Sequence, residues 1–210
     1  MENKAQKNMV SLFGQIASQW EFDHETSGER FGRITLKICR QSGTEDLIPL
    51  MVSEKFLEIG NIQPGIFATV EGMYRSYNMW ENDHSHLLLF VFVEDIFLFT
   101  SEHSMFWKNE ALIDGYLCKK PVYRKTPFGR EITDFLMAVN RTNGKTDYIP
   151  CICWGRNAKY VALLNIGDLV SVSGRIQSRE YHKVLPDGTY VNRTAYELSA
   201  RNVDRISEAV

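Results

Sequence analysis

Two aromatic residues, Tyr148 and Trp154, lie in the segment 147–154. Side chains of a β-strand point alternately to its two faces, so a strand here carries both rings on the same face. Ile152 shares that face, and the opposite, apolar face carries Ile149, Cys151 and Cys153. Exposed rings can stack on the unpaired bases of a single-stranded nucleic acid, at about 1–3 kcal/mol per base. Aromatic strand residues also cap cores or fill subunit interfaces, and this alternative stays open.

Basic residues gather around the aromatic ones in two further segments. One is a predicted hairpin at residues 119–130, and the other, residues 174–183, contains Tyr181. Cations that flank stacking rings can follow the phosphates of a nucleic acid, although surface lysines and arginines more often serve only solvation. The basic candidates for such contacts are Lys119, Lys120, Arg124, Lys125, Arg130, Arg141, Arg156, Arg175 and Arg179.

The elements that must position these residues follow from an internal repeat. Matching residues in the two halves lie 101 positions apart, and the spacing becomes 102 and then 107 further along. A repeat of this kind indicates two copies of one structural unit. We expect a first domain at residues 8–100 and a second at 109–206, with a linker from Thr100 to Lys108. The pairs that define the repeat include Gly14 with Gly115, Gly43 with Gly144, Pro49 with Pro150 and Gly72 with Gly174.

Within each copy the pattern is that of short strands. Apolar residues alternate from Phe31 to Ile38 and from Ile132 to Val139, and Asn143-Gly144 is a strong hairpin signal. One helix is predicted between the middle strands of each copy, at residues 54–59 and 157–164. About five strands and one helix in some 95 residues predict a small barrel.

The charge distribution separates the two copies. The 210 residues carry a net charge of −2, with a pI near 6.2, which taken alone argues against a nucleic-acid-binding protein. Residues 1–103 hold 8 basic and 15 acidic side chains, whereas residues 104–210 hold 16 and 11. Such asymmetry between halves indicates a charged partner for one of them. We expect the basic C-terminal copy to bind it.

A comparison of the copies sharpens this expectation. The first copy has acidic or neutral residues where the second has basic or aromatic ones, and only Tyr77, Met79, Trp80, Arg40 and Lys55 keep some of that chemistry. We infer that the first copy kept the barrel and lost much of the binding surface. The replacements are Asp23 for Arg124, His24 for Lys125, Glu29 for Arg130, Leu47 for Tyr148 and Ser53 for Trp154.

Several functional classes lack support in the sequence. The five histidines are scattered, the four cysteines form no C-x-x-C pair, and no nucleophile or phosphate-binding motif is present. We therefore expect no enzymatic activity, no metal and no cofactor. The N-terminus has no apolar signal-peptide core, and the apolar run at 87–99 is too short and too interrupted to cross a membrane. These features predict a cytoplasmic protein without membrane contact, which would be nucleoid-associated if its charged partner is DNA.

The second copy resembles the bacterial single-stranded DNA-binding protein (SSB) family over nearly its whole length. The stretches that carry the resemblance are 115–117, 126–129, 134–141, 147–151, 154–155, 167–170 and 174–181, with Arg124. The resemblance implies an all-β chain with short helices, folded as two tandem OB-fold five-stranded Greek-key barrels. It also implies sequence-independent binding of single-stranded DNA in replication, recombination or repair. The family's stacking positions fall on Tyr148, Trp154 and Tyr181, and its basic contacts on Arg124 and Arg179.

The family assembles four OB domains, so the resemblance implies a homodimer of this two-domain chain. Family members recruit replication and repair proteins through an acidic C-terminal tail, which has no counterpart after Arg205 here. Recruitment by that route is therefore not expected, and the acidic first copy is a candidate interaction surface. The alternative is an OB-fold protein-interaction module of the primosome-assembly type, in which nucleic-acid binding is weak and secondary.

Overall fold

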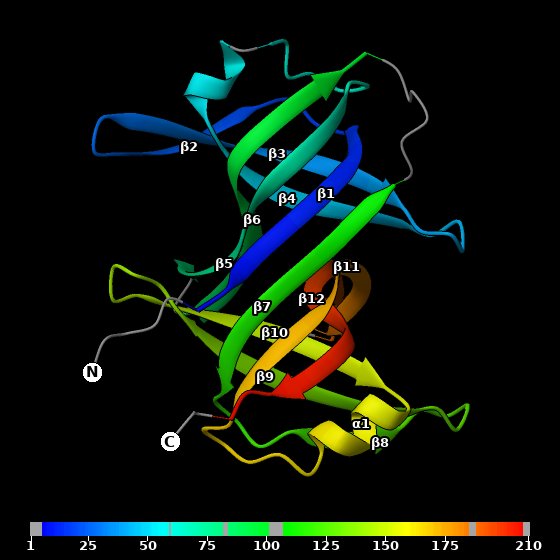
Figure 1. Ribbon diagram of the computed structural model, residues 1–210. Coiled ribbons are helices and arrows are strands. Elements are labelled where there is room, and N and C mark those ends of the chain that lie inside the picture. Colours follow the sequence, from blue (N-terminus) through cyan, green and yellow to red (C-terminus); the bar gives the residue numbers. More distant parts are fainter. Residues whose placement is uncertain (1–5, 59, 82–83, 101–106, 185–187, 208–210) are drawn as a thin grey trace.

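Two β-barrels, one above the other, make up the computed structural model (Figure 1). It describes residues 6–58, 60–81, 84–100, 107–184 and 188–207. The predicted linker falls largely on 101–106, outside the described residues, and the domain boundaries 8–100 and 109–206 stay a prediction. The elements of the first barrel are β1 (Asn8–Ile16), β2 (Glu21–Thr26), β3 (Glu29–Cys39), β4 (Glu45–Ser53), η1 (Glu54–Leu57), β5 (Phe67–Glu81) and β6 (His84–Phe99).

The second barrel repeats this order of elements. Its strands and helix are β7 (Lys108–Leu117), β8 (Val122–Lys125), β9 (Glu131–Asn140), β10 (Thr146–Trp154), α1 (Arg156–Val161), β11 (Leu169–Val184) and β12 (Tyr190–Arg205). Five strands close each barrel, in the orders β1-β3-β4-β6-β5 and β7-β9-β10-β12-β11. The pairs β4–β6 and β10–β12 are parallel, and the other pairs are antiparallel. The predicted pair of five-stranded barrels is therefore confirmed.

The two barrels share one continuous twelve-stranded sheet because β1 and β7 pair with each other. The pairing is antiparallel, with Val10 opposite Ala111 and Ser11 opposite Glu110. In Figure 1 these strands, blue and green, run side by side across the middle of the molecule. Main-chain hydrogen bonds across this seam satisfy strand edges that would otherwise be open. The barrels are thus joined as one body.

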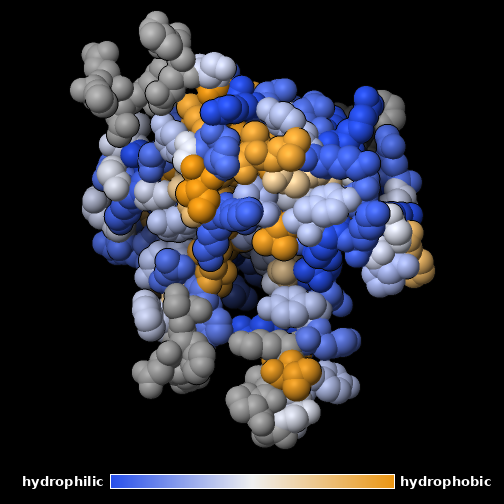
Figure 2. All heavy atoms as spheres, turned by 90° about the horizontal axis from the view of Figure 1, so that it is seen from below, coloured by the Kyte–Doolittle hydropathy of each residue, from blue (hydrophilic) through white to orange (hydrophobic). Residues whose placement is uncertain are grey.

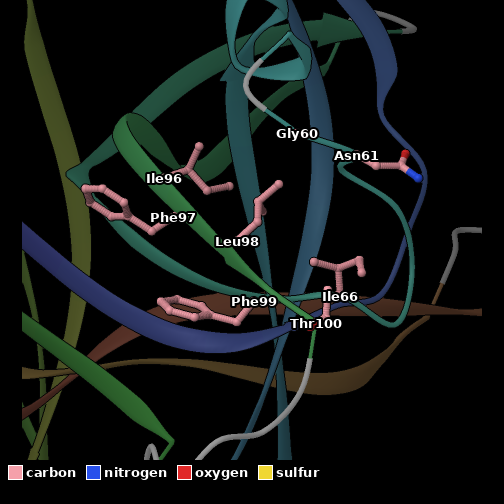
Figure 3. Close-up of a pocket in the computed structure, with 8 residues that line it drawn as sticks. All are labelled: Gly60, Asn61, Ile66, Ile96, Phe97, Leu98, Phe99 and Thr100. Atoms are coloured by element: carbon pink, nitrogen blue, oxygen red, sulfur yellow. The ribbon is translucent and has the colours of Figure 1, made fainter.

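Alternating apolar side chains fill the barrels, as the strand pattern predicts. Leu12, Leu36 and Val70 are fully buried in the first barrel, and Ile113 and Val172 in the second. The open end of the first barrel also carries an apolar pocket of about 410 Å³ (Figure 3). Its lining residues are Gly60, Asn61, Ile66, Ile96, Phe97, Leu98, Phe99 and Thr100.

The predicted helices are shorter than expected. The first is a 3₁₀ helix that begins at Glu54 and ends at Leu57, where Ser53 accepts a hydrogen bond from Lys55 N at 3.3 Å. The second begins at Arg156 and ends at Val161, in place of the predicted 157–164. The main chain turns after Val161, with Leu163 N donating to Tyr160 O. Among the described residues, no helix is long and apolar enough to cross a membrane.

Candidate functional site

The outer face of β10 carries the two predicted stacking rings. Tyr148 and Trp154 have 40% and 42% of their surface exposed, while Cys151 and Cys153 are buried on the opposite face. The alternation expected for this strand is therefore present at its rings and its core residues. The prediction differs at Ile152, which lies on the outer face but is only 5% exposed. Neighbouring residues cover it, so the exposed platform is two separate rings.

Strand β8 brings Arg124 to the same face. In the antiparallel registers Arg124 lies opposite Ile132 of β9, and Ile132 lies opposite Trp154 of β10. Residues directly opposite each other project to one face of a sheet, so Arg124 and Trp154 share it. Arg124 Nε donates to Asp134 Oδ2 at 2.6 Å, and this hydrogen bond raises the pKa of the guanidinium. Asp134 thereby positions a permanent cation beside the aromatic rings.

Strands β12 and β11 extend this face to Tyr181. Ile152 of β10 lies opposite Ser199 of β12, which lies opposite Arg175 of β11. Strand alternation from Arg175 then places Arg179 and Tyr181 on the same side, and both are exposed. We call the combined outer surface of β8, β9, β10, β12 and β11 the outer face. Its exposed aromatic residues and the basic residues placed by register are Arg124, Tyr148, Trp154, Arg175, Arg179 and Tyr181.

One basic residue on this face was missed by the sequence reasoning. Arg193 of β12 lies directly opposite Tyr181 and is exposed. Only the register of β11 against β12 reveals it, because alternation within one strand does not say which residues of the neighbouring strand lie opposite. A cation opposite a ring is well placed to meet the phosphate of a base stacked there.

Arg175 lies deeper than a surface cation. Burial lowers the pKa of its guanidinium, and its Nε is buried without a hydrogen-bond partner among the described residues. Its Nη2 lies 3.4 Å from Gln177 Oε1.

The other basic candidates are exposed around the hairpin and the helix. Lys125 lies opposite Glu131, so alternation turns it to the side away from Arg124. Arg130 closes the hairpin, where its N–H donates to Thr126 Oγ1 at 3.1 Å. Lys119 and Lys120 lie in the exposed connection from β7 to β8, and Arg156 begins α1. Lys119, Lys120, Arg130 and Arg156 thus lie around the outer face, and Lys125 is turned away from it.

Comparison with known protein families finds a match for the second barrel. Residues 108–206 match the profile of the Single-strand binding protein family. The second barrel belongs to that family. Relatives of this SSB-family barrel include Single-stranded DNA-binding protein A of Bacillus subtilis, 35% identical over 96 residues, which are 42% of this chain and 56% of that protein. Single-stranded DNA-binding protein 2 of Listeria monocytogenes is 40% identical over 80 residues, 35% of this chain and 50% of that protein.

The chain spans about half the length of these relatives. Solved structures extend the likeness to both barrels. The wild-type single-stranded DNA binding protein from Thermus aquaticus superposes with a TM-score of 0.75 over 98% of this chain and 96% of that chain, at 19% identity. A deletion variant of the Thermus protein gives the same TM-score over 98% and 97%, at 20% identity. At this identity the likeness shows the tandem barrel fold alone.

Arg141 has a different environment from the other candidates in the SSB-family barrel. Its Nε donates to Asp147 Oδ2 at 2.7 Å, and its Nη2 donates to Asp147 and, at 3.0 Å, to the main-chain oxygen of Ser76 in the first barrel. Asp147 is fully buried. The guanidinium of Arg141 is thus engaged in the contact between the barrels. Its predicted role in strand binding stays untested, and we assign it to this contact.

The corresponding strands of the first barrel carry ion pairs, and one large ring packs against the core there. Arg33 Nε lies 2.8 Å from Asp23 Oδ1, and Arg30 Nη1 lies 2.6 Å from Glu54 Oε1. Trp20 packs against Gly32, where a Cβ would lie 2.2 Å from the indole ring. The loss of basic and aromatic residues in this copy is therefore accompanied by an acidic, internally paired surface.

The described residues contain no group of three or more His, Cys, Asp or Glu side chains that could hold a metal ion. Burial raises the pKa of the Cys118, Cys151 and Cys153 thiols. Such thiols are poor nucleophiles and poor metal ligands. Seen from the end of the SSB-family barrel, the surface mixes apolar and strongly hydrophilic groups (Figure 2).

Proposed function

We propose that this protein binds single-stranded DNA without base specificity, mainly through the second barrel. Bases stack on Tyr148, Trp154 and Tyr181, and phosphates contact the surrounding arginines and lysines. The observation that carries the proposal is the continuous outer face, on which strand register brings exposed rings and cations from β8, β10 and β11 together. Rings without a pattern of base-specific donors give binding that tolerates any sequence.

The membership of residues 108–206 in the family, and the names of its relatives, support single-stranded DNA as the ligand. The mechanism needs only binding groups. Asp134 holds Arg124 beside Trp154, so a phosphate meets a cation whose orientation is already fixed. Preorganisation of this kind lowers the entropy lost on binding. We therefore propose a binding protein that uses no cofactor and catalyses no reaction.

Protection of single strands during replication, recombination or repair is the biological role that we propose for this binding. We also propose that two copies associate into a homodimer with four barrels. Mass measurement in solution by light scattering should give twice the 24.2 kDa of one chain. A mass of one chain at concentrations that bind DNA would overturn the dimer without affecting the binding proposal.

Fluorescence titration tests the proposed function directly. The chain has four tryptophans, and oligo-thymidine should quench the one that stacks, Trp154. The matched Trp154→Phe variant should lose most of the quenching while retaining an aromatic ring. Binding should weaken steeply as NaCl rises, because each phosphate contact releases counterions. Weak, salt-insensitive binding would instead favour the primosome-type interaction module.

A further inference from the structure

The contact between the two barrels is built twice, in two equivalent junctions. At the β5–β10 junction, Ser76 N donates to Asp147 Oδ1 at 2.6 Å and Tyr148 N donates to Ser76 Oγ at 2.8 Å. At the β4–β11 junction, Ser178 N donates to Asp46 Oδ1 at 2.8 Å and Leu47 N donates to Ser178 Oγ at 3.1 Å. The barrels are thus related by an internal two-fold arrangement that pairs position 76 with 178 and 47 with 148.

The β4–β11 junction is hollowed into a cavity of about 410 Å³. Its walls come from both barrels and carry carboxylates, Glu45 from the first and Glu180 from the second. Arg179 lies beside them, and the other cation of the lining, Arg40, is paired with Asp46. The two carboxylates make the interior of this cavity less suited to a polyanion than the outer face to which Arg179 belongs. Its lining residues are Arg40, Thr44, Glu45, Leu47, Gln177, Ser178, Arg179, Glu180, Thr194 and Tyr196.

The β5–β10 junction has the same construction with different side chains. By the repeat, Thr146 and Asn78 replace the two carboxylates, and Lys145 replaces Thr44. Two of the other positions carry rings, since Tyr148 replaces Leu47 and Tyr77 replaces Arg179. This junction therefore combines aromatic and basic residues without the carboxylates of its counterpart. The acidic first barrel contributes one of the rings.

Tyr77 is well placed to act with Tyr148. It follows Ser76 directly, and the hydroxyl of Ser76 is hydrogen-bonded to the main chain of Tyr148. Tyr77 is 61% exposed, so its ring is free for a ligand. Farther along β5, Trp80 is also strongly exposed. Isolated large rings on a strand are costly to hydrate, and stacking on a base removes that cost.

Arg75 adds a cation on the same side of β5 as Tyr77. Burial and the nearby Arg141 lower the pKa of its guanidinium. Its Nε is buried without a hydrogen-bond partner among the described residues, Nη2 lies 3.0 Å from the sulfur of Met73, and the guanidinium lies over the Phe92 ring, 5.2 Å from its centroid. A half-buried guanidinium with donors to spare is suited to a phosphate group.

We propose that the β5–β10 junction is part of the DNA-binding surface and is built by both barrels. Tyr77 and Arg75 of the first barrel extend the surface that the second barrel provides at Tyr148. The inference rests on the proposed function, and it changes the role of the first barrel. That barrel has lost the stacking platform on its own β4. It nevertheless supplies a ring and a cation to a DNA strand that the second barrel mainly binds.

The test is the affinity of the full chain for fluorescein-labelled oligo-thymidine. Tyr77→Ala should weaken binding by about 5-fold to 150-fold, the range expected for loss of one stacked base. Phe97→Ala is the matched control, since Phe97 is a 55% exposed ring on β6 of the same barrel that no junction contact involves. It should bind as the unaltered chain does. Lys145→Gln should reduce the salt dependence of binding.

The outcomes separate the inference from the function on which it rests. If Tyr148→Ala weakens binding and Tyr77→Ala does not, the composite junction is wrong and the proposed function stands. If the unaltered chain binds no oligo-thymidine, both fail. Photo-cross-linking with iododeoxyuridine strands gives a second measurement: the inference requires adducts on the peptide that contains Tyr77, and adducts confined to the second barrel would overturn it. Equal melting temperatures for both alanine variants exclude an effect of misfolding.

Discussion

The main-chain N–H of Ser76 in the first barrel donates at 2.6 Å to a carboxylate oxygen of Asp147 in the second. Asp147 is fully buried and is also held by two donors of Arg141. A buried carboxylate is stable only where hydrogen bonds and an opposite charge compensate for lost hydration. The ion pair and the barrel contact therefore depend on each other.

Asp147→Ala should lower the free energy of unfolding by about 3–5 kcal/mol, because it leaves Arg141 half-buried without its partner and Ser76 N–H without an acceptor. Urea unfolding followed by circular dichroism measures the change. Asp134→Ala is the control, since it removes the partner of an exposed arginine and should cost less than about 1 kcal/mol. Equal effects of the two substitutions would contradict the structural role of Asp147.

Trp154→Ala should weaken oligo-thymidine binding by about 1–3 kcal/mol, the contribution of one stacked base. Phe22→Ala provides the comparison, because Phe22 is an exposed ring on β2 in the first barrel, remote from the outer face. Fluorescence anisotropy gives both affinities. An unchanged affinity in a folded Trp154→Ala variant would remove Trp154 from the site.

The sequence predicts the barrels well because the repeat and the strand alternation are local or periodic signals. Residue spacing alone indicates that Tyr148 and Trp154 share a face. Contacts between distant residues leave no such signal. Ile152 is buried by its neighbours, and Arg141 donates a hydrogen bond to Ser76 of the other barrel. Both contacts depend on how the strands pack in the folded chain, and the sequence around each residue carries no signal of them.

The helices show a similar limit. Residues 54–59 have the composition of a helix, yet the structure forms only a 3₁₀ turn from Glu54 to Leu57. Short helices are marginal on their own and take their length from the packing available to them. The basic residue opposite Tyr181, Arg193, likewise becomes visible only through the pairing of β11 with β12.

Arg130→Gln should lower the slope of log affinity against log salt by about 0.7, as expected for one phosphate contact on a single strand. Arg130 is exposed at the hairpin, so unfolding should be nearly unaffected. Arg141→Gln should instead lower the free energy of unfolding strongly and change the slope of log affinity against log salt only little. Titrations at several NaCl concentrations separate the two, and a slope that responds only to Arg141 would reverse our assignments.

Gly174→Ala should destabilise the fold by about 1–3 kcal/mol, the usual cost of overpacking. Gly174 lies at a bulge between β11 and β12, where a Cβ would fall 2.2 Å from the main-chain oxygen of Ser199. Gly60→Ala is a useful contrast, because its Cβ would meet only the flexible end of the Leu98 side chain, at 2.8 Å. Thermal unfolding of both variants measures the difference. A Gly174→Ala variant as stable as Gly60→Ala would mean that the bulge relaxes freely.

The unfolding free energy should fall as pH rises above about 9, in part because of Cys153. Burial raises the pKa of this thiol from 9.0 to about 12. Between those values the unfolded chain loses the Cys153 proton while the folded chain retains it, so rising pH favours unfolding. The contribution is fully present below pH 9 and is lost progressively toward pH 12. Urea unfolding of the unaltered chain and of Cys153→Ala across this range isolates the contribution from those of tyrosine and lysine, because the variant should show a shallower decline. Parallel declines for the two proteins would show that the Cys153 thiol ionises equally readily in the folded and unfolded chains.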